Sequence, residues 1–153
     1  MRLFSILGVP VKLSPWLILI MGAMLVTGQQ ETLCIAVLAV GLHEIGHALC
    51  ARALGMPVRD VYFFPLGGVS RLSVQLQEAG WREAVIALFG PVINLVLAMG
   101  AIVLQENILG DERFNAFIYA NLTICAFNLI PAIPLDGGRA LRAMLMGFIG
   151  ADK

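Results

Sequence analysis

Apolar residues along this chain form long runs that short polar segments separate, a pattern typical of helices that cross a membrane. Ser14 followed by Pro15 predicts the start of the first helix, because serine caps helix N-termini and proline fits the first turn. Gly55, with Pro57 two residues later, predicts the end of the second helix. The predicted spans lie at about residues 15–26, 32–54, 82–104 and 114–128.

Two segments outside these runs have the composition of β-strands. Residues 3–13 are predicted to form short extended pieces around a Gly-Pro turn, and residues 58–72 to form a hairpin. The edge of an open hairpin is unsatisfied in lipid, so we expect the hairpin to pair with residues 3–13 at the membrane interface. With a last helix at about 138–148, the predicted fold is mainly α: a polytopic membrane helical bundle of about four spans with a small membrane-associated β-sheet.

The composition also indicates a membrane protein. Of the 153 residues, 59% are hydrophobic and 13% are charged, with a mean hydropathy of +0.89. A soluble domain is about 45–50% apolar and about 25% charged. The formal net charge is zero, which gives no indication of nucleic-acid binding. We expect a single intramembrane domain over residues 1–153, either a minimal protein or a core without further C-terminal spans or a regulatory domain.

The basic residues predict how the chain is oriented in the membrane. Residues 1–13 do not have the pattern of a signal peptide, because Gly8 and Pro10 interrupt their apolar stretch. With the N-terminus in the cytoplasm, nine of the ten Lys and Arg residues fall on or near the cytoplasmic side, and Arg113 alone falls outside. We therefore expect a multi-pass protein of the cell membrane, in contact with the lipid bilayer, with both termini cytoplasmic.

The candidate chemistry lies in the second predicted span, where His43, Glu44 and His47 form the pattern H-E-x-x-H. Two histidines four residues apart lie on one face of a helix and can bind one metal ion, with the glutamate as general base toward water. Ionisable groups inside an apolar helix are costly, so they indicate a functional site. The alternative, a buried histidine with satisfied hydrogen bonds, does not account for three polar groups in one apolar segment.

A catalytic zinc ion needs three protein ligands and one open position. The chain has two histidines, so the third ligand must be a carboxylate. Most carboxylates, Glu83 among them, lie in predicted loops or at span ends, whereas Asp136 lies in a long apolar stretch. The competing interpretation makes Asp136 the N-cap of the helix that follows. Cys50 lies seven residues from His43, about 10 Å along a helix, which is too far to share one ion.

Three motifs in this order resemble those of one known family. They are the H-E-x-x-H of residues 43–47, Phe-Gly-Pro-Val-Ile-Asn at residues 89–94, and Asn-Leu-Ile-Pro-Ala-Ile-Pro-Leu-Asp-Gly at residues 128–137. Together they resemble the site-2 protease family of intramembrane zinc metalloproteases. The resemblance covers most of the chain, including the segments predicted as membrane-associated strands.

The resemblance implies that His43, His47 and Asp136 bind Zn²⁺ and that Glu44 is the catalytic base. It implies regulated intramembrane proteolysis, the hydrolysis of a peptide bond within or near the transmembrane segment of another membrane protein. It further suggests that the substrate strand or the oxyanion is held by Asn94 and Asn128. The alternative for these two asparagines is hydrogen bonding between helices in lipid.

Two other functions are compatible with a metal site in a membrane. A metal transporter would distribute polar ligands along a path through several spans, whereas the predicted ligands here cluster at one depth. A catalytically inactive homologue would lack a ligand or the base, whereas His43, Glu44, His47 and Asp136 are all present. The sequence makes no prediction of the oligomeric state.

Overall fold

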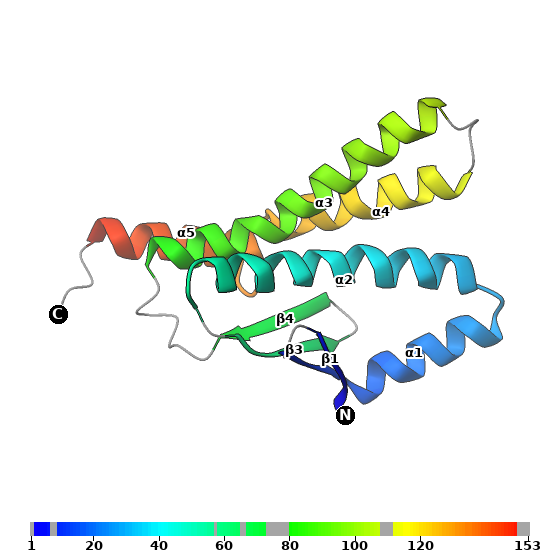
Figure 1. Ribbon diagram of the computed structural model, residues 1–153, viewed down its shortest axis with the longest axis horizontal. Helices are drawn as coiled ribbons and strands as arrows, with labels where there is room; N and C mark the ends of the chain where they lie inside the picture. Colours follow the sequence, from blue (N-terminus) through cyan, green and yellow to red (C-terminus); the bar gives the residue numbers. More distant parts are fainter. Residues whose placement is uncertain are drawn as a thin grey trace.

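The computed structural model describes residues 2–6, 9–56, 58–64, 67–72, 80–107 and 112–149 (Figure 1). Within these ranges the chain is mainly helical, which confirms the predicted class. The helices are α1 (Pro15–Val26), α2 (Gln30–Ala53), α3 (Trp81–Asn107), α4 (Glu112–Asn128) and α5 (Asp136–Ile149). The strands are β1 (Arg2–Ile6), β2 (Val9–Leu13), β3 (Val58–Phe64) and β4 (Gly67–Leu72).

The helix ends follow the local sequence signals. Oγ of Ser14 accepts a hydrogen bond of 3.1 Å from the backbone N–H of Leu17, which caps α1 as the sequence predicted. Helix α2 ends at Ala53, and Gly55 then takes a φ of 73°, a conformation that glycine adopts without strain. The last helix begins at Asp136, two residues earlier than predicted, so Asp136 belongs to its first turn.

Helix length supports membrane crossing for part of the bundle. In the part of the chain that the structure describes, residues 30–53 and residues 81–104 are long and apolar enough to cross a membrane. Helix α1 is apolar but has 12 residues, about 18 Å of helix. Helix α4 has 17 residues. Of the four predicted spans, helix length therefore supports the two at α2 and α3.

Helix α3 is the centre of the bundle and contacts α2, α4 and α5. Four alanines form its contact with α5, and two further alanines with Ile118 form its contact with α4. Small side chains allow helix backbones to approach closely, which is how helices commonly pack in lipid. Ala84 and Ala87 of α3 pack against Ala140 and Ala143 of α5, and Ala98 and Ala101 of α3 pack toward α4.

The four strands form one sheet in the order β1-β2-β3-β4. Strands β2 and β3 pair in parallel, so the N-terminal segment joins the later strands as the sequence predicted. Strands β3 and β4 pair antiparallel, with Tyr62 opposite Val69. Figure 1 shows the sheet on one side of α2 and helices α3 and α4 on the other, and both β3 and β4 contact α2.

The link between α4 and α5 packs tightly over the first turn of α5. It contains a cis peptide bond between Ile133 and Pro134. A Cβ added to Gly137 would lie 2.7 Å from the carbonyl oxygen of Ile130, and one added to Gly138 would overlap the same link. The two glycines therefore permit a close approach that sets the position of Asp136 at the start of α5.

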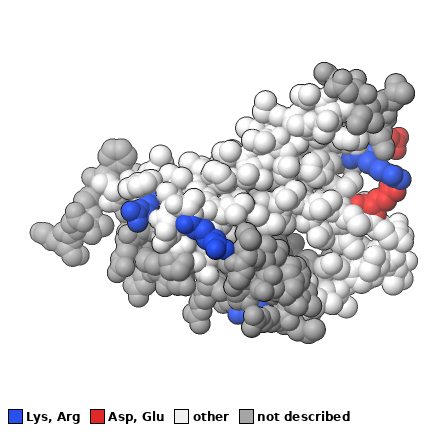
Figure 2. Space-filling model, in the orientation of Figure 1, with Lys and Arg blue, Asp and Glu red and all other residues white. Residues whose placement is uncertain are grey.

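Charged side chains are sparse on the described surface. In Figure 2 the charged atoms form a few separate patches, and uncharged atoms cover most of the described surface. Nη2 of Arg113 lies 2.9 Å from Oε1 of Glu31, which joins the first turn of α4 to the first turn of α2. Many large apolar side chains are exposed along the helices, for example Leu19, Val96 and Val103 at 63%, 59% and 60%. Exposed apolar side chains of this kind suit contact with lipid.

Candidate metal centre

Three side chains from two helices converge at one point inside the bundle. His43 and His47 lie on the buried face of α2, and Asp136 lies at the start of α5. Oδ2 of Asp136 is 3.1 Å from Nε2 of each histidine, and the two Nε2 atoms are also 3.1 Å apart. The three residues are 3%, 2% and 6% exposed. The structure thus brings together the three residues that the sequence predicted as metal ligands.

Hydrogen bonds on the far side of each imidazole fix the position of its proton. Nδ1 of His47 is 2.7 Å from the carbonyl oxygen of Ile86, which can only accept, so Nδ1 donates. Nδ1 of His43 is 2.5 Å from Oδ1 of Asn94. The amide nitrogen of Asn94 donates to the carbonyl oxygen of Ala39 at 3.3 Å, so Asn94 presents its oxygen to His43. Both histidines therefore direct a lone pair on Nε2 toward the carboxylate of Asp136.

The three converging atoms fit a bound cation. Lone-pair atoms in a triangle with sides of 3.1 Å repel one another unless a positive charge lies between them. A tetrahedral zinc ion with bonds of about 2.0–2.2 Å separates its ligand atoms by roughly 3.3–3.6 Å. The observed triangle is close to one face of that tetrahedron. Two imidazoles and one carboxylate are also a known ligand set of catalytic zinc, so the residues present fit Zn²⁺.

Helix α3 can hold both imidazoles because it carries glycine where it meets α2. A Cβ added to Gly90 would overlap the His47 ring and lie 2.8 Å from Cε1 of His43. On α2, a Cβ added to Gly46 would lie 2.7 Å from Cγ1 of Ile93. Within residues 89–94, which the sequence singled out as a motif, Gly90, Ile93 and Asn94 therefore lie against α2 at the site.

Among the described residues, the three predicted ligands form one compact group of potential metal-binding side chains. Cys50 is not a member of that group, as its spacing from His43 predicted. Glu44 is 3% exposed on α2 and lies outside the three-residue group. Its role as catalytic base stays a prediction.

The two asparagines predicted to hold substrate have different surroundings. Asn94 is fully buried, and its amide nitrogen also donates to Oδ1 of Asn121 at 2.7 Å. Its polar atoms thus contact His43, Ala39 and Asn121, which is the hydrogen bonding between helices that the sequence left open as the alternative. Asn128 is partly buried and donates to the carbonyl oxygen of Ile124 in its own helix at 3.0 Å. A substrate-binding role for either residue stays a prediction.

Three groups at the site were missed by the sequence analysis. The carbonyl oxygen of Ile86 is a backbone atom and has no sequence signal. Asn121 is a fully buried polar residue within α4, and its place in an apolar run was a usable signal. Nη1 of Arg139 lies 3.0 Å from Oδ1 of Asp136, three residues away on the same helix. That spacing is typical of paired side chains on a helix and could also have been recognised.

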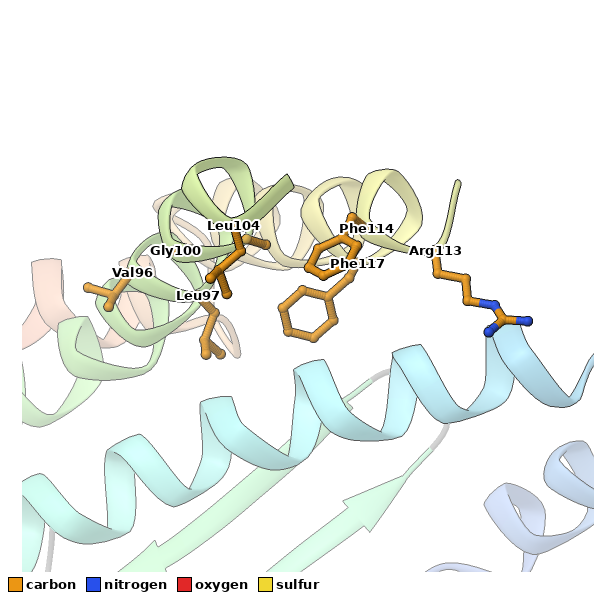
Figure 3. A pocket seen from close by; sticks show the side chains of 8 residues that line it. Val96, Leu97, Gly100, Leu104, Arg113, Phe114 and Phe117 are labelled. Carbon is orange, nitrogen blue, oxygen red and sulfur yellow. The ribbon is translucent and has the colours of Figure 1, made fainter. Parts of the chain in front are cut away.

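An apolar pocket of about 350 Å³ lies apart from these residues, at α3 and α4 (Figure 3). Its lining contains none of the predicted metal-binding or catalytic residues. Figure 3 shows the side chains of Leu97 and Phe117 pointing toward α2. The lining residues are Val96, Leu97, Gly100, Ala101, Leu104, Arg113, Phe114 and Phe117.

Comparison with known proteins identifies the family. A buried H-E-x-x-H with a carboxylate as third ligand defines a class of metallopeptidase. The family model of Peptidase family M50 matches residues 31–110, which is more than half of the chain and includes both histidines. The chain belongs to this family, the site-2 protease family that its motifs resemble.

Individual relatives agree with this assignment. A zinc metalloprotease of Methanocaldococcus jannaschii is 31% identical over 166 residues, covering 99% of this chain and 48% of the relative. Stage IV sporulation protein FB of Bacillus subtilis is 34% identical over 131 residues, covering 82% of this chain and 43% of the relative. The structure of the site-2 protease from Methanocaldococcus jannaschii matches with a TM-score of 0.79 and 27% identity. That match covers 99% of this chain and 74% of the archaeal one. The chain spans about half the length of the curated relatives it matches.

Proposed function

We propose that this chain is a zinc-dependent intramembrane endopeptidase that hydrolyses a peptide bond within or near the transmembrane segment of another membrane protein. The observation that carries the proposal is the triangle of His43, His47 and Asp136 side chains, buried within apolar helices. Membership of peptidase family M50 supports the reaction type. Several relatives are named as zinc metalloproteases, which supports the choice of metal.

In this proposal each residue of the site has one role. His43, His47 and Asp136 hold the zinc ion, and bound zinc lowers the pKa of a water molecule to about 7. Glu44 follows His43 directly on α2 and accepts a proton from the attacking water. The same carboxyl group then delivers the proton to the leaving amine. Glu44 has to remain outside the ligand set for this, because a fourth protein ligand would close the position that water needs.

The proposed orientation places the site at a definite depth. With the N-terminus in the cytoplasm, four spans would leave the end of α2 at the cytoplasmic face. His47 and His43 lie six and ten residues from Ala53, roughly 9 and 15 Å along the helix at 1.5 Å per residue. The ion pair between Glu31 and Arg113 supports this arrangement, since the starts of α2 and α4 then lie at the same face. The site would therefore cut within the cytoplasmic half of the bilayer.

The sheet supplies a way to present the substrate. A helical peptide bond is shielded by its own hydrogen bonds, so the substrate has to unwind before it is cut. Strand β4 is at the edge of the sheet and contacts α2, the helix that carries the histidines. An unwound peptide can add to such an edge through backbone hydrogen bonds. Of the two asparagines, we assign substrate contact first to Asn128, because Asn94 is already bonded to three protein groups.

The proposal is tested by cleavage of a transmembrane substrate in proteoliposomes. The native protein is expected to cut the substrate, to stop when a zinc chelator is added, and to recover when zinc is returned. The matched control is Glu44→Gln, which retains the shape of the side chain and should cleave at least ~10²-fold more slowly than the native protein. Cleavage that survives removal of all metal would contradict the proposal.

A further inference from the structure

A line of buried charges adjoins the metal centre. Asp136 uses its two carboxylate oxygens in different directions: Oδ2 faces the histidines at 3.1 Å, and Oδ1 accepts from Nη1 of Arg139 at 3.0 Å. The side chain of Arg139 is 18% exposed and that of Asp136 is 8% exposed, so this ion pair is largely removed from solvent. Charge-assisted hydrogen bonds of this kind are strong and directional.

The line continues to the first turn of α3. Glu83 has a fully buried side chain, and its Oε1 lies 2.7 Å from Nη2 of Arg142 and 3.9 Å from Nε of Arg139. A buried carboxylate is costly without a partner, so Glu83 requires these arginines. Arg139 therefore lies between two carboxylates, one on its own helix and one on α3. Arg142 contacts Glu83 and has no bond to Asp136 among the ion pairs of the described residues.

We propose that Arg139 is a positioning residue that holds Asp136 as a ligand through one oxygen. The inference rests on the proposed zinc site and deepens it. A carboxylate that is free to turn can bind an ion through both oxygens. With Oδ1 bonded to Arg139, only Oδ2 is directed at the histidines.

One-oxygen binding matters because a catalytic zinc ion needs an open position. Two histidines and one oxygen of Asp136 would supply three of the four ligands that a tetrahedral zinc ion takes and would leave one position for water. A second carboxylate oxygen would compete for that place. Groups that orient the ligands of a metal typically change its affinity or its activity by about 10–100-fold when they are removed.

The network offers a matched pair of variants for the test. Removing either arginine alone leaves Glu83 short of a partner, which could disturb folding. Both variants are therefore made in a Glu83→Gln background, where the side chain at position 83 carries no charge that requires a cation. Arg139→Met then removes the bond to Asp136, and Arg142→Met removes an arginine that has no such bond.

Zinc affinity is measured by competition with a chelator on the purified proteins in detergent. The Arg139→Met protein is expected to bind zinc at least ~10-fold more weakly than the Arg142→Met protein. Arg139→Lys, which keeps a cationic donor for Oδ1, is expected to bind more tightly than Arg139→Met. Equal affinity of the two Met variants, or of the Lys and Met variants, would overturn the inference.

The visible absorption of the cobalt-substituted proteins reports the coordination number of the metal, which a loss of packing alone would not raise. Release of Oδ1 should raise the coordination number and weaken the intense bands of a four-coordinate cobalt site in Arg139→Met alone. An unchanged spectrum in that variant would overturn the one-oxygen assignment. A native protein that binds no zinc would instead contradict the proposed function, so the two failures are distinguishable.

Discussion

Oδ1 of Asn94 on α3 accepts the proton that Nδ1 of His43 on α2 carries, at a distance of 2.5 Å. This bond sets the tautomer of His43 and leaves the Nε2 lone pair for metal. It also joins α2 and α3, the two helices whose length and hydropathy make them candidate membrane spans. We therefore expect Asn94 to orient the His43 imidazole, a role that the motif at residues 89–94 did not reveal.

The first prediction concerns this bond. Asn94→Ala should leave the Nδ1–H of His43 and the Oδ1 of Asn121 unpaired inside the bundle, at a cost of about 1–3 kcal/mol each. Zinc affinity, measured by competition with a chelator, should fall by about 10–100-fold because the imidazole loses its orientation. Asn128→Ala is the matched control, since Asn128 bonds only within its own helix among the described contacts.

The same pair of variants separates the two interpretations of the asparagines. If Asn128 contacts the substrate, Asn128→Ala should raise KM or lower kcat while zinc stays bound. If Asn94→Ala kept native zinc affinity and lost only substrate cleavage, the orienting role assigned to Asn94 would be wrong.

The second prediction concerns the close contact of α3 with the imidazoles. Gly90→Ala places a methyl group where the His47 ring lies, so α2 and α3 must move apart or the ring must turn. Zinc content after purification, measured by atomic emission, should drop well below one ion per chain. Gly100→Ala is the control, because a Cβ added there meets nothing within 4 Å. Equal zinc content in the two variants would contradict this prediction, because it would mean that α3 can shift to accommodate the added methyl group.

Much of this fold could be predicted from the sequence, because lipid allows few arrangements of backbone. Long apolar runs indicated α2 and α3, and the spacing of His43 and His47 placed both imidazoles on one helical face. Asp136 was found by exclusion, since it was the remaining carboxylate in a long apolar stretch. These inferences depend on composition and helical period, both of which are local properties of the chain.

Other features depend on contacts between distant segments and had no such signal. Glu83 was predicted to lie at the polar end of a span, whereas it is fully buried against two arginines of α5. Its burial follows from the packing of α5 on α3, which periodicity does not predict. The start of α5 at Asp136 likewise depends on the close packing of the preceding link against Gly137.

The third prediction concerns orientation in the membrane. Single cysteines are placed at Gln29, in the turn between α1 and α2, and at Arg82, at the start of α3, after Cys34, Cys50 and Cys125 are replaced by alanine. A membrane-impermeant maleimide should label position 29 in intact cells and position 82 only after permeabilisation. The reverse result would contradict the orientation that the basic residues predict.

The last prediction separates the base from the ligands. Glu44→Gln retains the size of the side chain but cannot accept a proton from water, so cleavage of a transmembrane substrate should fall by at least ~10²-fold. Zinc should stay bound, because Glu44 lies outside the group formed by His43, His47 and Asp136.

The comparison variants are His47→Ala and Asp136→Ala. Each lacks one of the three predicted ligand side chains and should lose both zinc and cleavage. Metal content and cleavage are measured on the same preparations, so the two properties can be compared directly. Release of zinc by Glu44→Gln to the extent seen in His47→Ala would make Glu44 a ligand and fill the position required for water. Cleavage near the native rate in Glu44→Gln would mean that another buried carboxyl group accepts the proton. Full zinc binding by Asp136→Ala would contradict the proposed set of three ligands.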